Sequence, residues 1–200
     1  MINKVLLLED RPSRSNQILT PDQRLKLDSF EFVNIPIEME CDNYIISINN
    51  GNCSELKSFS LLMIHRSALN HNGLRYIMDV CKTNKLDLVL FSGGISQNLY
   101  LNEGYQYLTI HSRYFYSDKL LIFLSKYSVN KYTSLLELAH GELWILEQLM
   151  RYRRLQIMLS SEADEYNKSL YEEKMLTIEK NISVDNTSID DKINTYFNIL

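Results

Sequence analysis

The stretch "SLLMIHRSALNHNGL" (60–74) holds an apolar run that stops at a histidine and a polar loop that leads to a glycine. With the residue before it, its first part reads "FSLLMIH" (59–65), and such a short apolar run is typical of a strand buried on both faces. "LRYIMDVCKTNK" (74–85) has the spacing of an amphipathic helix, and "LDLVLFS" (86–92) predicts a second strand. A strand, a helix and a strand in this order predict a βαβ unit, whose two strands run parallel.

The same alternation continues on both sides of this unit. We expect the other strands at "KVLLLE" (4–9), at "YQYLTIH" (105–111) and at one or both of "SFEFVNI" (29–35) and "YIISI" (44–48). Further helices are expected over 14–27, with a break at Pro21, and over 117–127, with Ser117 as the cap. Strands separated by helices predict a parallel sheet with helices on both faces.

The length and composition predict a globular protein. With 200 residues, of which 45% are hydrophobic and 23% charged, the chain can form one domain with its own core and an appendage. No window approaches 18 uncharged apolar residues, and the start, "MINKVLLLEDRP", lacks the apolar run and cleavage site of a signal peptide. We therefore expect a cytoplasmic protein that does not enter a membrane.

The cysteines give no sign of a structural crosslink. Cys41, Cys53 and Cys81 are odd in number and have no CxxC spacing. This pattern argues against a disulfide framework and against a zinc site. We expect three free thiols, no bound metal and no cofactor.

The charge is mildly acidic and unevenly distributed. Of the net charge of −4, all lies in residues 131–200, which hold 8 Lys/Arg against 12 Asp/Glu. A chain without a basic stripe is a poor candidate for unaided binding to nucleic acid. The exception is the short basic cluster "RYRR" (151–154), which follows several glutamates in the same predicted helix.

Polar residues stand where the predicted strands end. Glu9 and Asp10 follow the apolar run at the start of the chain. His65 closes the strand expected over 59–65, Ser92 the one over 86–92 and His111 the one over 105–111. In an open parallel sheet, ligands and chemistry gather at the carboxyl ends of the strands. We therefore expect these side chains to converge on one rim.

This arrangement resembles the receiver domain of bacterial response regulators over roughly residues 1–127. The resemblance rests on the acidic pair in "LLLED", an acceptor position at His65, Gly73 eight residues later and the Ser in "LVLFSG". It implies a flavodoxin-like five-stranded parallel sheet over these residues, to which the sequence after them adds a C-terminal helical extension. Two positions depart from the family: Leu69 replaces a proline of the loop, and His111 or Ser112 lies near the position of a lysine.

The resemblance also implies a chemistry that His65 does not provide. In the family, an aspartate at this position accepts a phosphoryl group and helps the acidic pair to hold Mg²⁺, a cation that favours carboxylates and water over imidazole. A hydrogen bond from His65 to Asp10 or Glu9 is expected where the metal would lie. We interpret the chain as a pseudo-receiver, in which His65 is either structural or a metal ligand or proton sensor.

Two further patterns bear on ligands and catalysis. Ser92, Gly93 and Gly94 form either a cradle for an anion, bound by backbone N–H groups, or simply a tight turn. No GxSxG elbow is present, and Cys81 lies in the middle of a predicted helix. We expect no enzymatic activity.

After the receiver-like domain (1–130), the sequence predicts a helical extension (131–200) for docking or dimerisation. A capping box of Ser134 and Glu137 opens a helix over 134–159, in which Gly141 is a weak point, and the helical pattern goes on over 160–180. A last short helix is expected after Ser188. The residues expected to take part in interactions are Trp144, Leu149, Arg151, Arg153 and Arg154.

The apolar stripe of this extension must be covered by its own domain, a second copy or a partner. We therefore expect a protein–protein interaction module, independent of phosphorylation, that binds a protein partner or itself through the extension. Two alternatives remain: a DNA-associated regulator that uses the C-terminal helices, and a metal-binding protein or enzyme that uses Glu9, Asp10 and His65.

Overall fold

The computed structural model describes residues 4–102, 105–129, 135–141 and 143–182. The chain divides into two compact units, Met1–Gly141 and Glu142–Leu200. The division falls later than the expected boundary at residue 130, because helix α7 (Leu135–His140) contributes Leu135, Leu138 and Ala139 to a core of the first unit.

A six-stranded sheet with the order β2-β1-β3-β4-β6-β5 forms the centre of the first unit. Its first five strands in this order are all parallel, so the flavodoxin-like α/β fold predicted from the sequence is confirmed. The sixth, β5, lies at the edge, is antiparallel to β6 and was not predicted. The strands are β1 (Val5–Leu8), β2 (Val33–Asn34), β3 (Leu61–His65), β4 (Asp87–Ser92), β5 (Asn98–Asn102) and β6 (Tyr105–His111).

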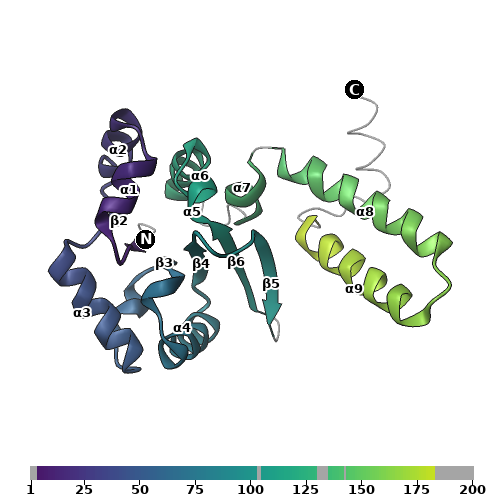
Figure 1. The fold of residues 1–200 in the computed structure, drawn as a ribbon, viewed down its shortest axis with the longest axis horizontal. Coiled ribbons are helices and arrows are strands. Elements are labelled where there is room, and N and C mark those ends of the chain that lie inside the picture. The colour runs from purple at the N-terminus through teal and green to yellow at the C-terminus, as the bar shows by residue number, and fades with distance from the viewer. Residues whose placement is uncertain (1–3, 103–104, 130–134, 142, 183–200) are drawn as a thin grey trace. The chain divides into compact units, whose positions relative to one another are not determined.

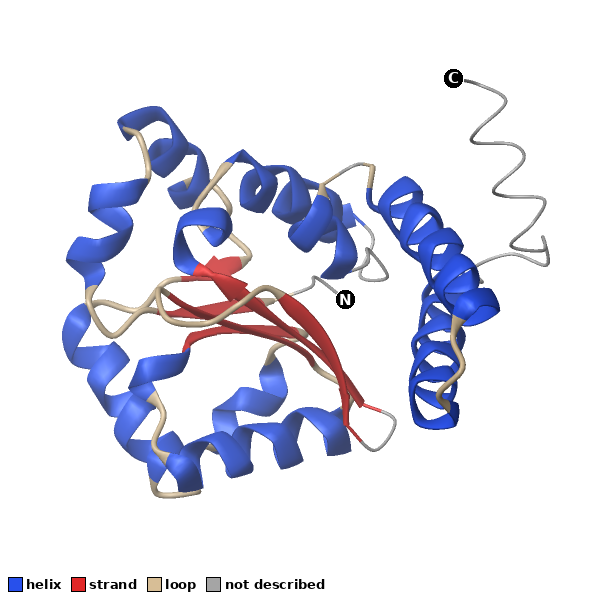
Figure 2. Cartoon of the chain, turned by 45° about the vertical axis from the view of Figure 1, so that its right-hand side comes forward, coloured by secondary structure: helices blue, strands red, loops and turns tan. Residues whose placement is uncertain are grey.

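Helices cover both faces of this sheet (Figures 1 and 2). One face carries α1 (Pro12–Ile18), α2 (Pro21–Asp28), α5 (Ser112–Phe115), α6 (Asp118–Val129) and α7. The other carries α3 (Glu38–Asn49), the 3₁₀ turn η1 (Ser54–Ser58) and α4 (His71–Asn84), while the 3₁₀ turn η2 (Arg66–Ala68) directly follows β3.

Alternate residues of each strand supply the two cores. In β3, Leu61 and Met63 join the core under α6, whereas Leu62 and Ile64 join the core under α3 and α4. Successive side chains of a strand point to opposite faces, so a strand covered on both sides must be apolar throughout. This requirement explains the unbroken apolar runs that made these strands recognisable.

The expected strand "YIISI" (44–48) is wrong, because these residues belong to α3. Two buried residues of α3, Cys41 and Ile48, are seven positions apart, which places them on one face of a helix. Glu38 and Glu40 lie in its first turn, where acidic side chains are favourable. The other proposed strand, 29–35, forms pairs only at Val33–Asn34.

The second unit contains α8 (Trp144–Ser161) and α9 (Glu165–Ile182), which pack side by side (Figure 1). The single helix expected over 134–159 is interrupted at Gly141, whose φ of +80° lies in the left-handed region that favours glycine. Ser134 of the expected capping box and the helix expected after Ser188 lie outside the described residues.

The described helices include none that is long and apolar enough to cross a bilayer.

Candidate functional site

The structure brings three predicted site residues together at the carboxyl ends of the strands. Glu9 and Asp10 follow β1, and His65 closes the neighbouring strand β3. The His65 Nδ1 atom lies 3.1 Å from the Asp10 Oδ1 atom, and one ligand atom from each of the three residues lies within 4.8 Å of the others. The predicted contact between His65 and the acidic pair is therefore present.

Arg14 completes this cluster and was missed by the sequence analysis. Its Nη1 donates to Glu9 Oε1 at 2.9 Å and to Asp10 Oδ1 at 3.2 Å, and it also contacts His65 Nε2. Pro12 lies in the first turn of α1, so the helix begins almost directly after the acidic pair. One turn later, Arg14 returns to Asp10, four residues before it.

His65 is buried, with 2% of its side chain exposed, and both ring nitrogens have partners. Nε2 contacts Arg14, which can only donate, while Nδ1 lies 2.6 Å from Ser67 Oγ. Ser67 in turn donates to Asp10 Oδ2 at 3.0 Å. Burial lowers the pKa of His65 to about 4, and the charge of Arg14 adds to this effect while Asp10 opposes it. The ring is therefore neutral, with its proton on Nδ1.

The two carboxyl groups are different in character. Burial, and then the hydrogen bond with Asp10, raise the pKa of Glu9 to about 7, although Arg14 opposes this. Tyr116 donates its hydroxyl to Glu9 Oε2 at 3.1 Å. For Asp10, burial acts to raise the pKa, but the hydrogen bond from Glu9, the hydrogen bond from Ser67 and the charge of Arg14 together hold it below its usual value. Near neutral pH the cluster thus contains the Asp10 carboxylate, a Glu9 that is partly protonated, and one guanidinium.

These residues do not fit Mg²⁺, the ion that the receiver resemblance implies. Mg²⁺ requires oxygen ligands in near-octahedral geometry, and His65 offers an imidazole in place of the third carboxylate. In addition, the Arg14 Nη1 atom contacts one ligand atom of each of the three residues. A cation there would lie against a positive charge.

Two aromatic rings pack beside His65 and hold its position. The ring of Phe91, its partner in the register of β3 and β4, meets it edge-on with centroids 5.3 Å apart. Phe115 stacks on Phe91 at 4.1 Å. This packing leaves the imidazole little freedom to rotate away from Arg14 and Ser67.

The other predicted residues, Ser92, Gly93, Gly94 and His111, form no hydrogen bond or ion pair with Glu9 or Asp10; their side-chain hydrogen bonds are accepted from Gly94 N–H and Arg113 N–H. They line a neighbouring cavity of about 510 Å³, together with Arg11, Arg14, Ile18, His65, Ser67, Ser112 and Arg113. The pairing of Ser92 with His111 places the ends of β4 and β6 side by side at this cavity. The predicted residues thus fall into two adjoining groups, the acidic cluster and the cavity lining. His65 and the unpredicted Arg14 belong to both.

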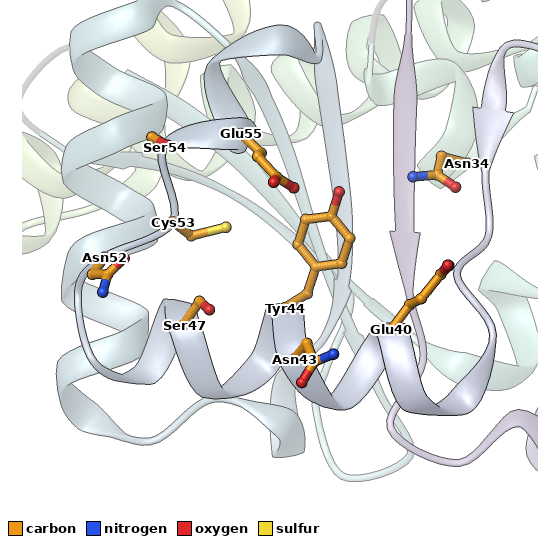
Figure 3. Close-up of a pocket in the computed structure, with 9 residues that line it drawn as sticks. All are labelled: Asn34, Glu40, Asn43, Tyr44, Ser47, Asn52, Cys53, Ser54 and Glu55. Atoms are coloured by element: carbon orange, nitrogen blue, oxygen red, sulfur yellow. The ribbon is translucent and has the colours of Figure 1, made fainter.

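A second cavity, of about 620 Å³, lies between α3 and η1 (Figure 3). It is lined by Asn34, Glu40, Asn43, Tyr44, Ser47, Asn52, Cys53, Ser54 and Glu55. Burial, and then the hydrogen bond with Glu55, raise the pKa of Tyr44 to about 12, so its hydroxyl stays protonated. Among the described residues, the lining includes two carboxyl groups and no basic side chain, which is unfavourable for an anion.

The expected interaction residues of the second unit differ in exposure. Trp144 and Leu149 are buried, so part of the apolar stripe is already covered within the chain. Arg151, Arg153 and Arg154 are exposed on α8. Exposed apolar side chains of this unit include Met150, Ile157 and Met158.

Comparison with known proteins yields no relative: no family model, no curated protein and no solved structure matches the chain.

Proposed function

We propose that the protein is a non-catalytic, receiver-like module that regulates a partner by protein–protein contact and without aspartyl phosphorylation. The observation that carries this proposal is the position of Arg14 among Glu9, Asp10 and His65. A guanidinium supplied by the chain itself neutralises the charge that would otherwise attract a divalent cation. The cluster is then held together by the chain's own side chains and needs no metal ion.

His65 is also unsuited to act as a phosphoryl acceptor. A nucleophilic imidazole must present a free nitrogen to the phosphorus atom. The lone pair of Nε2 faces Arg14, and Nδ1 lies within hydrogen-bonding distance of Ser67 and Asp10. With 2% of the side chain exposed, a phosphoryl donor has no access to either nitrogen unless this network opens.

A groove beside the β5–β6 hairpin supports the proposed protein contact. Parallel strands are usually joined by a helix, but the connection from β4 to β6 carries β5 and no helix among its described residues. A groove of about 640 Å³ lies between this hairpin and α4, and its lining includes the apolar residues Leu74, Met78, Leu90, Ile95 and Tyr107.

The charges around this groove suggest the nature of the partner. Arg66, His71 and Arg75 line it together with a single acidic residue, Asp79. An apolar floor with a largely basic rim matches an amphipathic helix that has acidic residues beside its apolar face. We place this partner and the module in the cytoplasm, since the three cysteines are free and buried, as is usual in a reducing compartment.

Incubation with acetyl phosphate and Mg²⁺, followed by intact-mass spectrometry at neutral and alkaline pH, tests the first part of this proposal. We expect no gain of a phosphoryl group. The matched variant His65→Asp, which restores the carboxylate, controls for access of the reagent. A stable phosphoryl adduct on the natural chain, lost in His65→Ala, would overturn the proposal.

Affinity capture from the native cell extract tests the second part, with Met78→Glu in the groove and Met158→Glu on α8 as matched variants. We expect Met78→Glu alone to lose the partner, and crosslinking to place an acidic helix of that partner against α4. If only Met158→Glu loses it, the C-terminal helices are the contact surface instead.

A further inference from the structure

The cavity at the carboxyl ends of β4 and β6 has a strongly basic lining. Three arginines, Arg11, Arg14 and Arg113, give it this character, and the rest of its lining consists of the neutral His65, His111, Ile18, three serines and two glycines. No carboxylate is among its lining residues in the described part of the chain. This charge stands out in a protein whose net charge is −4.

The arginines retain donors for a ligand. All contacts of Arg14 with described residues use Nη1, which leaves Nε and Nη2 available, and 23% of the side chain is exposed. Arg11 and Arg113 are exposed, and no carboxylate in the described ranges forms an ion pair with either guanidinium. Unpaired guanidinium groups around a cavity are suited to a phosphate, whose oxygens accept pairs of N–H donors.

The two glycines of the cavity are not required by the fold. Neither Gly93 nor Gly94 has a φ in the left-handed region, and a Cβ built on either would meet no atom within 4 Å. Alanine would therefore fit at both positions. What glycine provides here is backbone without a side chain, which a phosphate oxygen can approach closely; the Gly94 N–H donates only a long hydrogen bond, of 3.5 Å, to Ser92 Oγ.

We propose that this cavity binds the phosphate group of a small metabolite without covalent reaction. Arg113, Arg11 and the free donors of Arg14 would hold the oxygens, and Gly93 and Gly94 would allow the group to approach the backbone. The volume of about 510 Å³ is sufficient for a phosphate and a small organic body. A nucleic acid is disfavoured, because the chain as a whole is acidic and lacks an extended basic surface.

This proposal goes beyond the pseudo-receiver function and fails separately from it. It predicts reversible binding, whereas the acetyl phosphate experiment detects a covalent adduct. A chain that binds phosphate reversibly and gains no mass would satisfy both proposals.

Isothermal titration calorimetry of the full chain with inorganic phosphate, pyrophosphate and a phosphate monoester, at constant ionic strength, tests the proposal. Chloride and acetate serve as control anions, which carry no phosphate group and should not bind saturably. We expect saturable binding of the phosphates with one site per chain. Arg113→Ala should weaken it about tenfold or more, because charge-assisted hydrogen bonds are lost.

Two further variants separate binding from folding. Gly94→Val places a side chain in open space, so it should leave the thermal midpoint unchanged while it blocks the cavity and abolishes binding. Arg75→Ala removes an exposed arginine that lines the α4 groove and should leave phosphate affinity as it is. The proposal is overturned if no phosphate binds saturably, or if Arg113→Ala and Gly94→Val bind as tightly as the natural chain.

Discussion

Replacing Arg14 by alanine is the sharpest perturbation of the strand-end cluster. It removes the guanidinium whose Nη1 contacts Glu9 at 2.9 Å and Asp10 at 3.2 Å, and leaves two carboxyl groups that are 6% and 20% exposed. Removal of one partner from a buried ion pair costs about 3–5 kcal/mol. Here the expected loss is smaller, about 1–3 kcal/mol at pH 8, because Arg14 and Asp10 are partly exposed and Glu9 can take up a proton.

The loss in the free energy of unfolding should depend on pH in a definite direction. The pKa of Glu9 is already raised to about 7, so the stability linked to its protonation is present below its ordinary value of 4.5 and lost as the pH rises through about 7. Without Arg14, which lowers this pKa, the carboxyl group ionises at a still higher pH. Arg14→Ala should therefore cost little at pH 6 and more at pH 8.

Urea denaturation at pH 6 and pH 8 measures this difference, with Arg75→Ala as the matched loss of an exposed arginine. If Arg14→Ala is as stable as the natural chain at both pH values, or is more destabilised at pH 6, the guanidinium does not neutralise the acidic pair. The assignment of Arg14 as the internal cation would then fail.

Three further results are expected. In Arg14→Ala, the ligand atoms of Glu9, Asp10 and His65, which lie within 4.8 Å of one another, become available to a metal ion. Zn²⁺ should therefore raise the thermal midpoint of this variant. It should raise neither the midpoint of the natural chain nor that of the double variant Arg14→Ala, His65→Ala. Burial raises the pKa of Asp87 to about 6, so the stability linked to its protonation is lost as the pH rises through that value. Asp87→Asn keeps an acceptor for the Tyr127 hydroxyl and should raise the free energy of unfolding at pH 7 by up to about 3 kcal/mol. Urea denaturation should show no such gain below pH 4. Gly73→Ala would bring a Cβ to 2.1 Å from Asn49 Oδ1 and should cost about 1–3 kcal/mol by thermal denaturation, whereas Gly93→Ala should cost nothing.

Much of the fold follows from one physical requirement, that strands covered on both faces be apolar throughout. The runs that became β1, β3 and β4 satisfy it, and they were predicted. "YIISI" is a short apolar run as well, and such runs do not distinguish a strand from a helix. The apolar residues Cys41 and Ile48, seven positions apart, could have indicated the helical period, and the structure shows that both are buried.

The missed strand β5 had a signal of another kind. Two runs of alternating character, "NLYLN" and "YQYLTIH", are separated by a short segment that contains Gly104, which is the pattern of a hairpin. No element was expected between residues 92 and 105. β5 lies at the edge of the sheet and pairs with β6 alone, in the antiparallel direction, so a short hairpin loop can join the two strands.

The site was predicted as a set of strand ends, and the residues that decide its chemistry lie just beyond them. Asp10 and Arg14 are four residues apart, a spacing that the proline at the start of α1 could have indicated as helical. Ser67 had no comparable signal, because no sequence pattern marked the turn η2 that places it beside His65.

Arg14 links the two proposals physically, and this link decides which variants can separate them. Its Nη1 belongs to the acidic cluster and Arg14 also lines the cavity, so Arg14→Ala disturbs both and cannot separate the two proposals. Arg113 and Gly94 contact no carboxylate of the cluster within the described residues, so their replacement bears on the anion only. A phosphate bound beside Arg14 would add negative charge near Glu9 and raise its pKa further, so phosphate binding should take up a fraction of a proton near pH 7. Titration in two buffers of different ionisation enthalpy measures this uptake, and phosphate binding to the natural chain without proton uptake would show that the two sites do not share a charge.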